Sequence, residues 1–159
     1  MTGGVTVRRA EPEDYAAVRA LNAMDFRHHQ QARPDYFRAD GVDYRQEQFT
    51  RLLAHPAPIA WVAEAEGRVV SLCLGTVKLV EGTALRRPRR VAVVEDLATL
   101  PEFRGRGIAS ALLERARRQA AELGAEALEL CVWGFNQNAR RLYEDFGMTV
   151  QYTRMELKL

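Results

Sequence analysis

Arg104-Gly105-Arg106-Gly107-Ile108-Ala109-Ser110 is the stretch that decides the fold, and it lies between a strand-like apolar run and a long amphipathic helix. A helix N-terminus carries backbone N–H groups without intrahelical partners and a positive partial charge. Gly105 and Gly107 let the backbone approach a bulky anion, and Ala109 is nearly as small. Arg104 and Arg106 add positive charge at the same end. The stretch therefore predicts a pyrophosphate site formed by residues 104–110.

A dinucleotide-binding turn is the first alternative, because Gly105-x-Gly107 also begins the pattern G-x-G-x-x-G. Ser110 stands where that pattern needs its third glycine. Residues 101–104 separate the glycines from the preceding strand, and no β-α-β half comes before them. These three departures argue against a Rossmann domain.

The segments around the turn alternate between strand and helix patterns. Residues 90–100 and 127–133 are strand-like, and residues 105–123 place an apolar stripe on one side of a helix that Gly124 ends. A shorter helix is predicted over residues 136–146, and a last strand over residues 149–159. Strands joined by a crossover helix should be parallel neighbours.

The first half of the chain supplies the rest of the sheet. Residues 5–9 predict a strand, Pro12 opens a helix that ends before Pro34, and residues 43–55 predict a second helix. Strands follow at 59–65 and 68–80, with a tight turn at Glu66-Gly67. The order β-α-α-β-β-β-α-β-α-β predicts one α/β domain over residues 1–159, with a mixed central sheet flanked by helices.

Two motifs resemble the GNAT-type N-acetyltransferase superfamily. Arg104-x-x-Gly107-x-Ala109 resembles its R/Q-x-x-G-x-G/A motif. Asn136-x-x-Ala139-x-x-Leu142-Tyr143-x-x-Phe146-Gly147-Met148 resembles its N-x-x-A-x-x-F/L-Y-x-x-x-G-F segment. The departures are Ala109 for glycine, and Leu142 and Met148 for phenylalanine, and the close resemblance covers about residues 91–148.

The resemblance implies a GNAT-like fold in which two parallel strands splay apart around acetyl-CoA. The strand segment Leu97-Ala98-Thr99 would pair with the pantetheine arm through the backbone of Leu97 and Thr99. The pyrophosphate would lie on the amides of Gly105 to Ser110, and Asn136 would contact the cofactor from the facing helix. Tyr143 would be the general acid that protonates the leaving thiolate.

An amine acceptor arrives protonated at neutral pH, so some group must take its proton, usually a carboxylate that acts directly or through water. Glu95 and Asp96 are the candidates, and strand alternation predicts that they point to opposite faces. Glu95 is preferred because an acid at this place resembles the polyamine-acetylating branch of the superfamily. Asp96 remains the alternative.

Composition limits the partners and the compartment. The 159 residues carry a net charge of +2, too balanced to predict nucleic-acid binding. Two cysteines make no disulfide framework, residues 1–9 lack the apolar core of a signal peptide, and no apolar run reaches the ~20 residues of a membrane span. We therefore expect a cytoplasmic protein with no membrane contact. His28-His29 lies in no metal-ligand pattern, so no metal is expected.

The leading hypothesis is an N-acetyltransferase for a primary amine: a small polyamine-like amine, an amino sugar, or a peptide or protein amine. A non-catalytic acyl-CoA-binding sensor on the same fold is the second hypothesis. A dinucleotide-binding oxidoreductase is the third. The last strand, residues 149–159, offers an edge through which a homodimer would form, and the sequence leaves that question open.

Overall fold

The structure is a computed structural model that describes residues 4–41 and 44–159. In this part of the chain five strands form one sheet, whose spatial order follows their order in the sequence. They are β1 (Thr6–Arg9), β2 (Pro58–Ala65), β3 (Arg68–Val80), β4 (Arg89–Thr99) and β5 (Ala127–Leu130). Strands β1 to β4 pair antiparallel, and β4 pairs parallel with β5. The mixed α/β sheet expected from the sequence is confirmed.

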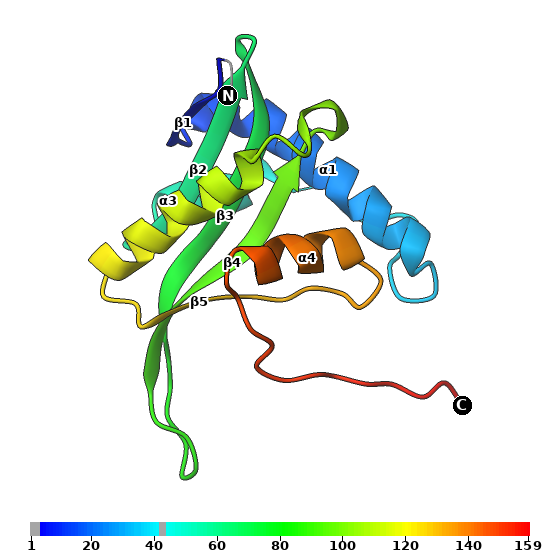
Figure 1. Cartoon of the computed structure of the whole chain (residues 1–159), viewed down its shortest axis with the longest axis vertical. Coiled ribbons are helices and arrows are strands. Elements are labelled where there is room, and N and C mark those ends of the chain that lie inside the picture. The colour runs from blue at the N-terminus through cyan, green and yellow to red at the C-terminus, as the bar shows by residue number, and fades with distance from the viewer. Residues whose placement is uncertain (1–3, 42–43) are drawn as a thin grey trace.

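Helices cover both faces of this sheet (Figure 1). On one face lie α1 (Tyr15–Ala32) and α2 (Gln46–Leu53), and on the other lie α3 (Ile108–Glu122) and α4 (Gln137–Asp145). Two short 3-10 turns, η1 (Pro12–Asp14) and η2 (Pro101–Phe103), precede α1 and α3. Asp43, which the sequence assigns to the start of the second helix, lies outside the described residues.

The core divides into two clusters, one on each side of the sheet. The α3-side cluster joins the helix stripe to the strands and includes Ile108, Leu112, Leu113, Ala116 and Ala120 together with Ile59, Cys73 and Val94. The α1-side cluster includes Val18, Leu21 and Phe49 together with Val62, Leu72, Leu74 and Ala98. Apolar burial is the main stabilising contribution here, at about 25 cal/mol for each Å² removed from water. Because both helix stripes face the sheet, the strands between them are packed on both faces.

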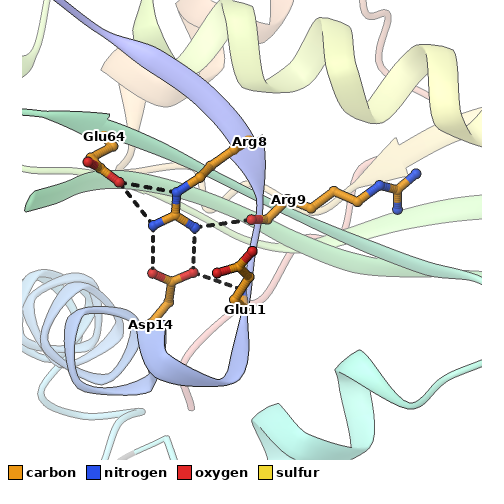
Figure 2. A network of polar contacts seen from close by, with 5 residues as sticks. All are labelled: Arg8, Arg9, Glu11, Asp14 and Glu64. Atoms are coloured by element: carbon orange, nitrogen blue, oxygen red, sulfur yellow. Dashed lines mark hydrogen bonds and ion pairs between the residues drawn. The ribbon is translucent and has the colours of Figure 1, made fainter.

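A hydrogen-bonded network fixes the beginning of α1 (Figure 2). The guanidinium of Arg8 on β1 donates two bonds to the buried carboxylate of Asp14, at 2.8 and 2.9 Å, and others to Glu64 on β2. The N–H of Glu11 donates to Asp14 at 2.8 Å. Burial alone would raise the pKa of Asp14, but the hydrogen bonds from Arg8 and Glu11 outweigh it and hold that pKa below its ordinary value. The network therefore ties β1, β2 and the entry to α1 together.

A β-bulge interrupts β4 next to the centre of the sheet. Leu74 of β3 pairs with Asp96, whereas the next residue, Gly75, pairs with Val94, so Glu95 is the extra residue. A Cβ at Gly75 would lie 1.9 Å from the carbonyl oxygen of Val93, a contact that no side chain tolerates. Glycine is therefore required opposite the bulge, and the bulge changes the direction of the side chains that follow it.

Two strand predictions were wrong in extent. The strand expected over residues 127–133 ends at Leu130, because Trp133 and Phe135 turn toward α1 and pack against aromatic side chains there. The strand expected over residues 149–159 is absent, because that segment has no strand partner in the described chain.

Candidate active site

The turn before α3 presents a row of backbone donors. Gly105 and Gly107 have φ angles of 72° and 76°, in the left-handed region that favours glycine. A Cβ at either position would meet nothing within 4 Å, so both face open space. Within residues 4–41 and 44–159, the amides of residues 105–110 donate to no protein acceptor; Ala111 is the first to do so, to Gly107. This cradle at the N-terminus of a 15-residue helix fits a pyrophosphate.

The two arginines of the turn are bound to the backbone around it. Arg104 donates from Nε to the carbonyl of Thr99 at 3.0 Å. Arg106 donates from Nη2 to the carbonyl of Glu102 at 2.8 Å, and its guanidinium lies 4.9 Å from the ring centroid of Phe103. These contacts hold two positive charges beside the row of amides.

Strands β4 and β5 separate next to this turn. Their pairing covers Val91–Val94 with Ala127–Leu130, whereas β4 continues to Thr99 without β5 beside it. The part of β4 that lacks β5 beside it, but still pairs with β3, includes Leu97, Ala98 and Thr99. The carbonyl of Ala98 accepts from Ser71 at 2.8 Å and that of Thr99 accepts from Arg104, so both carbonyls are already engaged. Only part of the expected edge is therefore available to a ligand.

The bulge brings Glu95 and Asp96 to the same face of the sheet. Val94 and Leu97 both pack in the α3-side cluster, and the two residues between them both turn toward α1. Tyr44 packs against the α1-side cluster. Burial, then the charges of Asp96 and Glu95, raise its pKa to about 12. The expectation that Glu95 and Asp96 point to opposite faces was wrong, because it assumed an uninterrupted strand.

Asp96 has a pKa well above the ordinary value of an aspartate. Burial, with a smaller contribution from the charges of Glu95 and Asp25, raises its pKa to about 6. Glu95, by contrast, is exposed. A buried carboxyl with a pKa close to neutrality is suited to proton transfer.

Asp25 on α1 is a candidate that the sequence analysis did not select. It follows Val18 and Leu21 at the spacing of the buried stripe, so a charged residue at a core-facing position was the available signal. Burial raises its pKa, although nearby His29, His28 and Arg104 partly oppose that effect. One turn earlier, Asn22 has a buried Nδ2 that meets no acceptor among the described residues. We call Asp25, Glu95 and Asp96 the acidic cluster.

The second motif, at the start of and along α4, supplies two more side chains. Tyr143 packs against the α3-side cluster, and burial, then the charges of Asp25 and Cys73, raise its pKa to about 12. Its hydroxyl is therefore protonated at neutral pH, and it donates to no described residue. Asn136 precedes α4 and accepts from the N–H of Ala139 at 3.2 Å, so its side chain caps that helix.

Aromatic side chains from three segments gather beside the acidic cluster. We call them the aromatic cluster; they come from α1, from the loop after it and from the segment after β5, and are Phe26, His28, His29, Tyr36, Phe37, Trp133 and Phe135. The ring centroids of Tyr36 and Trp133 are 4.9 Å apart, and Arg33 lies over both rings. His29 contacts both clusters, since its Nδ1 lies 3.4 Å from the carboxylate of Asp25.

The comparison with known families agrees with this geometry. Residues 19–148 match the Acetyltransferase (GNAT) family. The chain belongs to this family. The superfamily resemblance inferred from the two motifs is thereby confirmed, and the paired strands that separate beside a glycine turn are those of a GNAT fold.

Individual relatives of this GNAT chain match it over different lengths. It is 35% identical over 72 residues to the uncharacterized N-acetyltransferase YdgE of Bacillus subtilis, covering 45% of this chain and 46% of YdgE. It is 33% identical over 95 residues to an uncharacterized N-acetyltransferase of Archaeoglobus fulgidus, covering 60% of this chain and 63% of that protein. The chain thus spans less than two thirds of either relative's length. A crystal structure of a mutant BH1408 protein from Bacillus halodurans has the same fold, with a TM-score of 0.88 at 23% identity over 97% of this chain and 99% of that one.

The described residues lack the features of two other classes of site. No helix among them is both long and apolar enough for a membrane crossing. In the same residues, His, Cys, Asp and Glu side chains form no group of three or more that suits a metal ion.

Proposed function

We propose that this GNAT chain transfers the acetyl group of acetyl-CoA to a primary amine. The amine nitrogen forms a bond to the acetyl carbonyl carbon while the carbon–sulfur bond breaks and CoA leaves as the thiol. The separation of β4 from β5 carries this proposal. The amides of residues 105–110, which have no acceptor among the described residues, lie in the turn that follows β4. Tyr143 and the acidic cluster are the groups near the separation that can transfer a proton.

The turn before α3 would hold the cofactor. The amides of residues 105–110 would bind its pyrophosphate, aided by the charges of Arg104 and Arg106. Leu97, Ala98 and Thr99 on unpaired β4 would line the pantetheine arm. Leu97 and Thr99 would present their backbone groups at the open edge, and Thr99 would contribute its N–H because its carbonyl accepts from Arg104. Asn136 would approach the cofactor from the start of α4.

The acidic cluster would take the proton of the arriving ammonium group. Burial of Asp96 and its pKa of about 6 favour it as the base over the exposed Glu95 that the sequence suggested. A carboxyl with that pKa is ionised at neutral pH and still releases its proton to water readily. Asp25 and Glu95 would attract and orient the positive charge before the proton is lost.

Tyr143 would supply the proton for the departing sulfur. A phenol with a pKa of about 12 is fully protonated at neutral pH, so its O–H is available to donate a hydrogen bond to the sulfur as negative charge develops there. Its location beside the α3-side cluster keeps it away from bulk water.

The acceptor is proposed to be a cationic amine, because the charges of Glu95 and Asp25 act on Asp96 on the side where it would enter. The aromatic cluster would contact the part of the acceptor next to the amine, since aromatic faces also attract cations. Polyamine-like amines, amino sugars and peptide amines all meet these requirements.

A melting experiment with acetyl-CoA, CoA and NAD in parallel tests the proposal. A ligand at 100 times its Kd stabilises the folded state by about 2.7 kcal/mol, which a melting curve detects. We expect both CoA species, and not NAD, to raise the melting temperature, and thiol release with a panel of cationic amines to follow. Absence of a shift with CoA would overturn the cofactor assignment, and a shift with NAD would favour a dinucleotide-binding protein. Tight CoA binding without turnover on any amine would favour a sensor.

A further inference from the structure

The hairpin that joins β3 to β4 projects beyond the body of the protein (Figure 1). Val77 and Val91 are buried at its base, whereas all the residues between them are exposed. β3 and β4 stay paired as far as Val80 and Arg89. We call residues 78–90 the arm. The arm is an extension of the sheet that lies outside both core clusters.

The tip of the arm has a defined shape. The N–H of Thr83 donates to the carbonyl of Arg86 at 2.8 Å. The hydroxyl oxygen of Thr83 accepts from the N–H groups of Leu85 and Arg86, at 3.2 and 3.1 Å. A Cβ at Gly82 would lie 2.9 Å from Cδ of Pro88, so glycine lets the two sides of the loop approach each other. These contacts hold Leu85 in a position where it is 95% exposed.

Positive charge is concentrated on the arm. The arm carries five of the chain's 23 basic side chains and one of its 21 acidic ones, Glu81, and so has a net charge of +4. The remaining 18 basic and 20 acidic side chains give the rest of the chain a net charge of −2. The balanced charge of the whole chain therefore conceals a separation of charge, with a positive arm on a slightly negative body.

The four arginines of the arm differ in their contacts. Arg89 and Arg90 donate to acceptors within residues 123–129, at 2.8 to 2.9 Å, and so fix the base of the arm to the body. The side chains of Arg86 and Arg87, at the tip, form no hydrogen bond or ion pair within the described part of the chain. The charges at the tip are thus available to a partner.

The composition of the arm favours an anionic lipid surface among the anionic partners. Leu79 and Val80 are 57% and 44% exposed, so together with Leu85 they place three large apolar side chains among the basic ones. An apolar side chain can enter the boundary between headgroups and acyl chains while guanidinium groups remain at the phosphates. By contrast, the arm contains no aromatic residue on which a nucleic-acid base would stack.

We propose that the arm binds the surface of a membrane that contains anionic phospholipids, with Leu85 at the acyl boundary and Arg86 and Arg87 on lipid phosphates. The expectation of no membrane contact rested on the lack of a spanning segment, which peripheral binding does not need. The 11 residues of β4 place the turn before α3 roughly 30 Å from the base of the arm. Lipid binding therefore leaves the candidate active site open, and the proposal does not depend on acetyl transfer.

Co-sedimentation of the full chain with vesicles tests the proposal. We expect binding to vesicles of phosphatidylcholine and phosphatidylglycerol in equal amounts, weakened by salt, and no binding to phosphatidylcholine alone. Arg86→Gln/Arg87→Gln should weaken binding by roughly 30-fold, since each basic residue at an anionic surface contributes about fivefold. The matched control, Arg117→Gln/Arg118→Gln, removes two charges from the exposed face of α3 and should bind nearly as the native chain does. No binding to the anionic vesicles, or an equal loss in the control, would overturn the proposal.

A fluorescent label distinguishes insertion of the tip from general attraction of charge. The label is attached to Leu85→Cys in a Cys131→Ser chain, because the other cysteine, Cys73, is buried. We expect the emission of an environment-sensitive dye to shift to the blue on anionic vesicles. The same dye on Glu47→Cys, at an exposed position of α2, should not shift. An unshifted dye at position 85 on bound protein, or binding to polyglutamate in place of vesicles, would assign the arm to a soluble anionic partner and contradict the proposal.

Discussion

Replacing Asp96 by asparagine should make the protein more stable at neutral pH while it lowers activity. The pKa of Asp96 rises from 3.8 to about 6 because the carboxyl is buried and lies near Glu95 and Asp25. That rise corresponds to about 3 kcal/mol of preference for the protonated form in the folded state. Asparagine has a similar shape and carries no charge, so it removes the cost of ionising a buried acid.

The pH dependence of this gain follows from the direction of the pKa change. Protonation of Asp96 stabilises the folded state fully below pH 3.8, and this contribution is lost as the pH rises through about 6. At pH 8 the Asp96→Asn variant should therefore be more stable than the native chain by up to about 3 kcal/mol, equivalent to roughly 6–12 °C in melting temperature. Near pH 4 the two proteins should melt together.

Melting temperatures measured from pH 4 to pH 8 check this reasoning, with Asp145→Asn as the control because it makes the same chemical change at an exposed position of α4. The control should change the melting temperature little at any pH. The kcat/KM of the native chain should fall as the pH drops below about 6, where Asp96 becomes protonated. The residual kcat/KM of Asp96→Asn should not show this fall. Equal stability of Asp96→Asn and the native chain at pH 8 would refute the argument that Asp96 is held in an unfavourable ionised state.

Three further outcomes are expected. Tyr143→Phe should lower kcat by roughly 10²-fold and leave the Kd for CoA nearly unchanged, since a general acid contributes about 10²–10⁴-fold; full activity would exclude Tyr143 as the acid. Gly107→Glu should abolish CoA binding in calorimetry, because it brings a carboxylate to the row of amides, whereas Glu122→Gln at the other end of α3 should bind normally. Arg8→Met should reduce stability most above pH 4 and least below it, because the low pKa of Asp14 that Arg8 maintains contributes only while that carboxylate is ionised; a loss independent of pH would contradict this.

Sequence patterns determined the elements and the glycine turn before α3 because both depend on local chemistry. The apolar stripe of α3 requires only the repeat of a helix, and it predicted Ile108, Leu112, Ala116 and Ala120 as buried residues. Gly105 and Gly107 are needed for a backbone conformation that few other residues adopt, so their spacing before a helix predicted the turn. The order of strands and the crossover helix likewise determined which pair of strands is parallel.

The chemistry of the acceptor side was decided by the tertiary structure. The bulge at Glu95 depends on how β4 aligns with Gly75 on β3. The alternation of side chains within β4 does not predict it. The packing of α1 on the sheet places Asp25 where its charge raises the pKa values of Asp96 and Tyr143. The sequence of α1 alone does not predict that proximity. The pKa of a carboxyl depends on burial and on charges that are distant in the sequence, so it cannot be read from its neighbours along the chain. Residues 149–159 have the composition of a strand. Whether they form one depends on a partner edge that lies outside the segment, so their own sequence does not decide it.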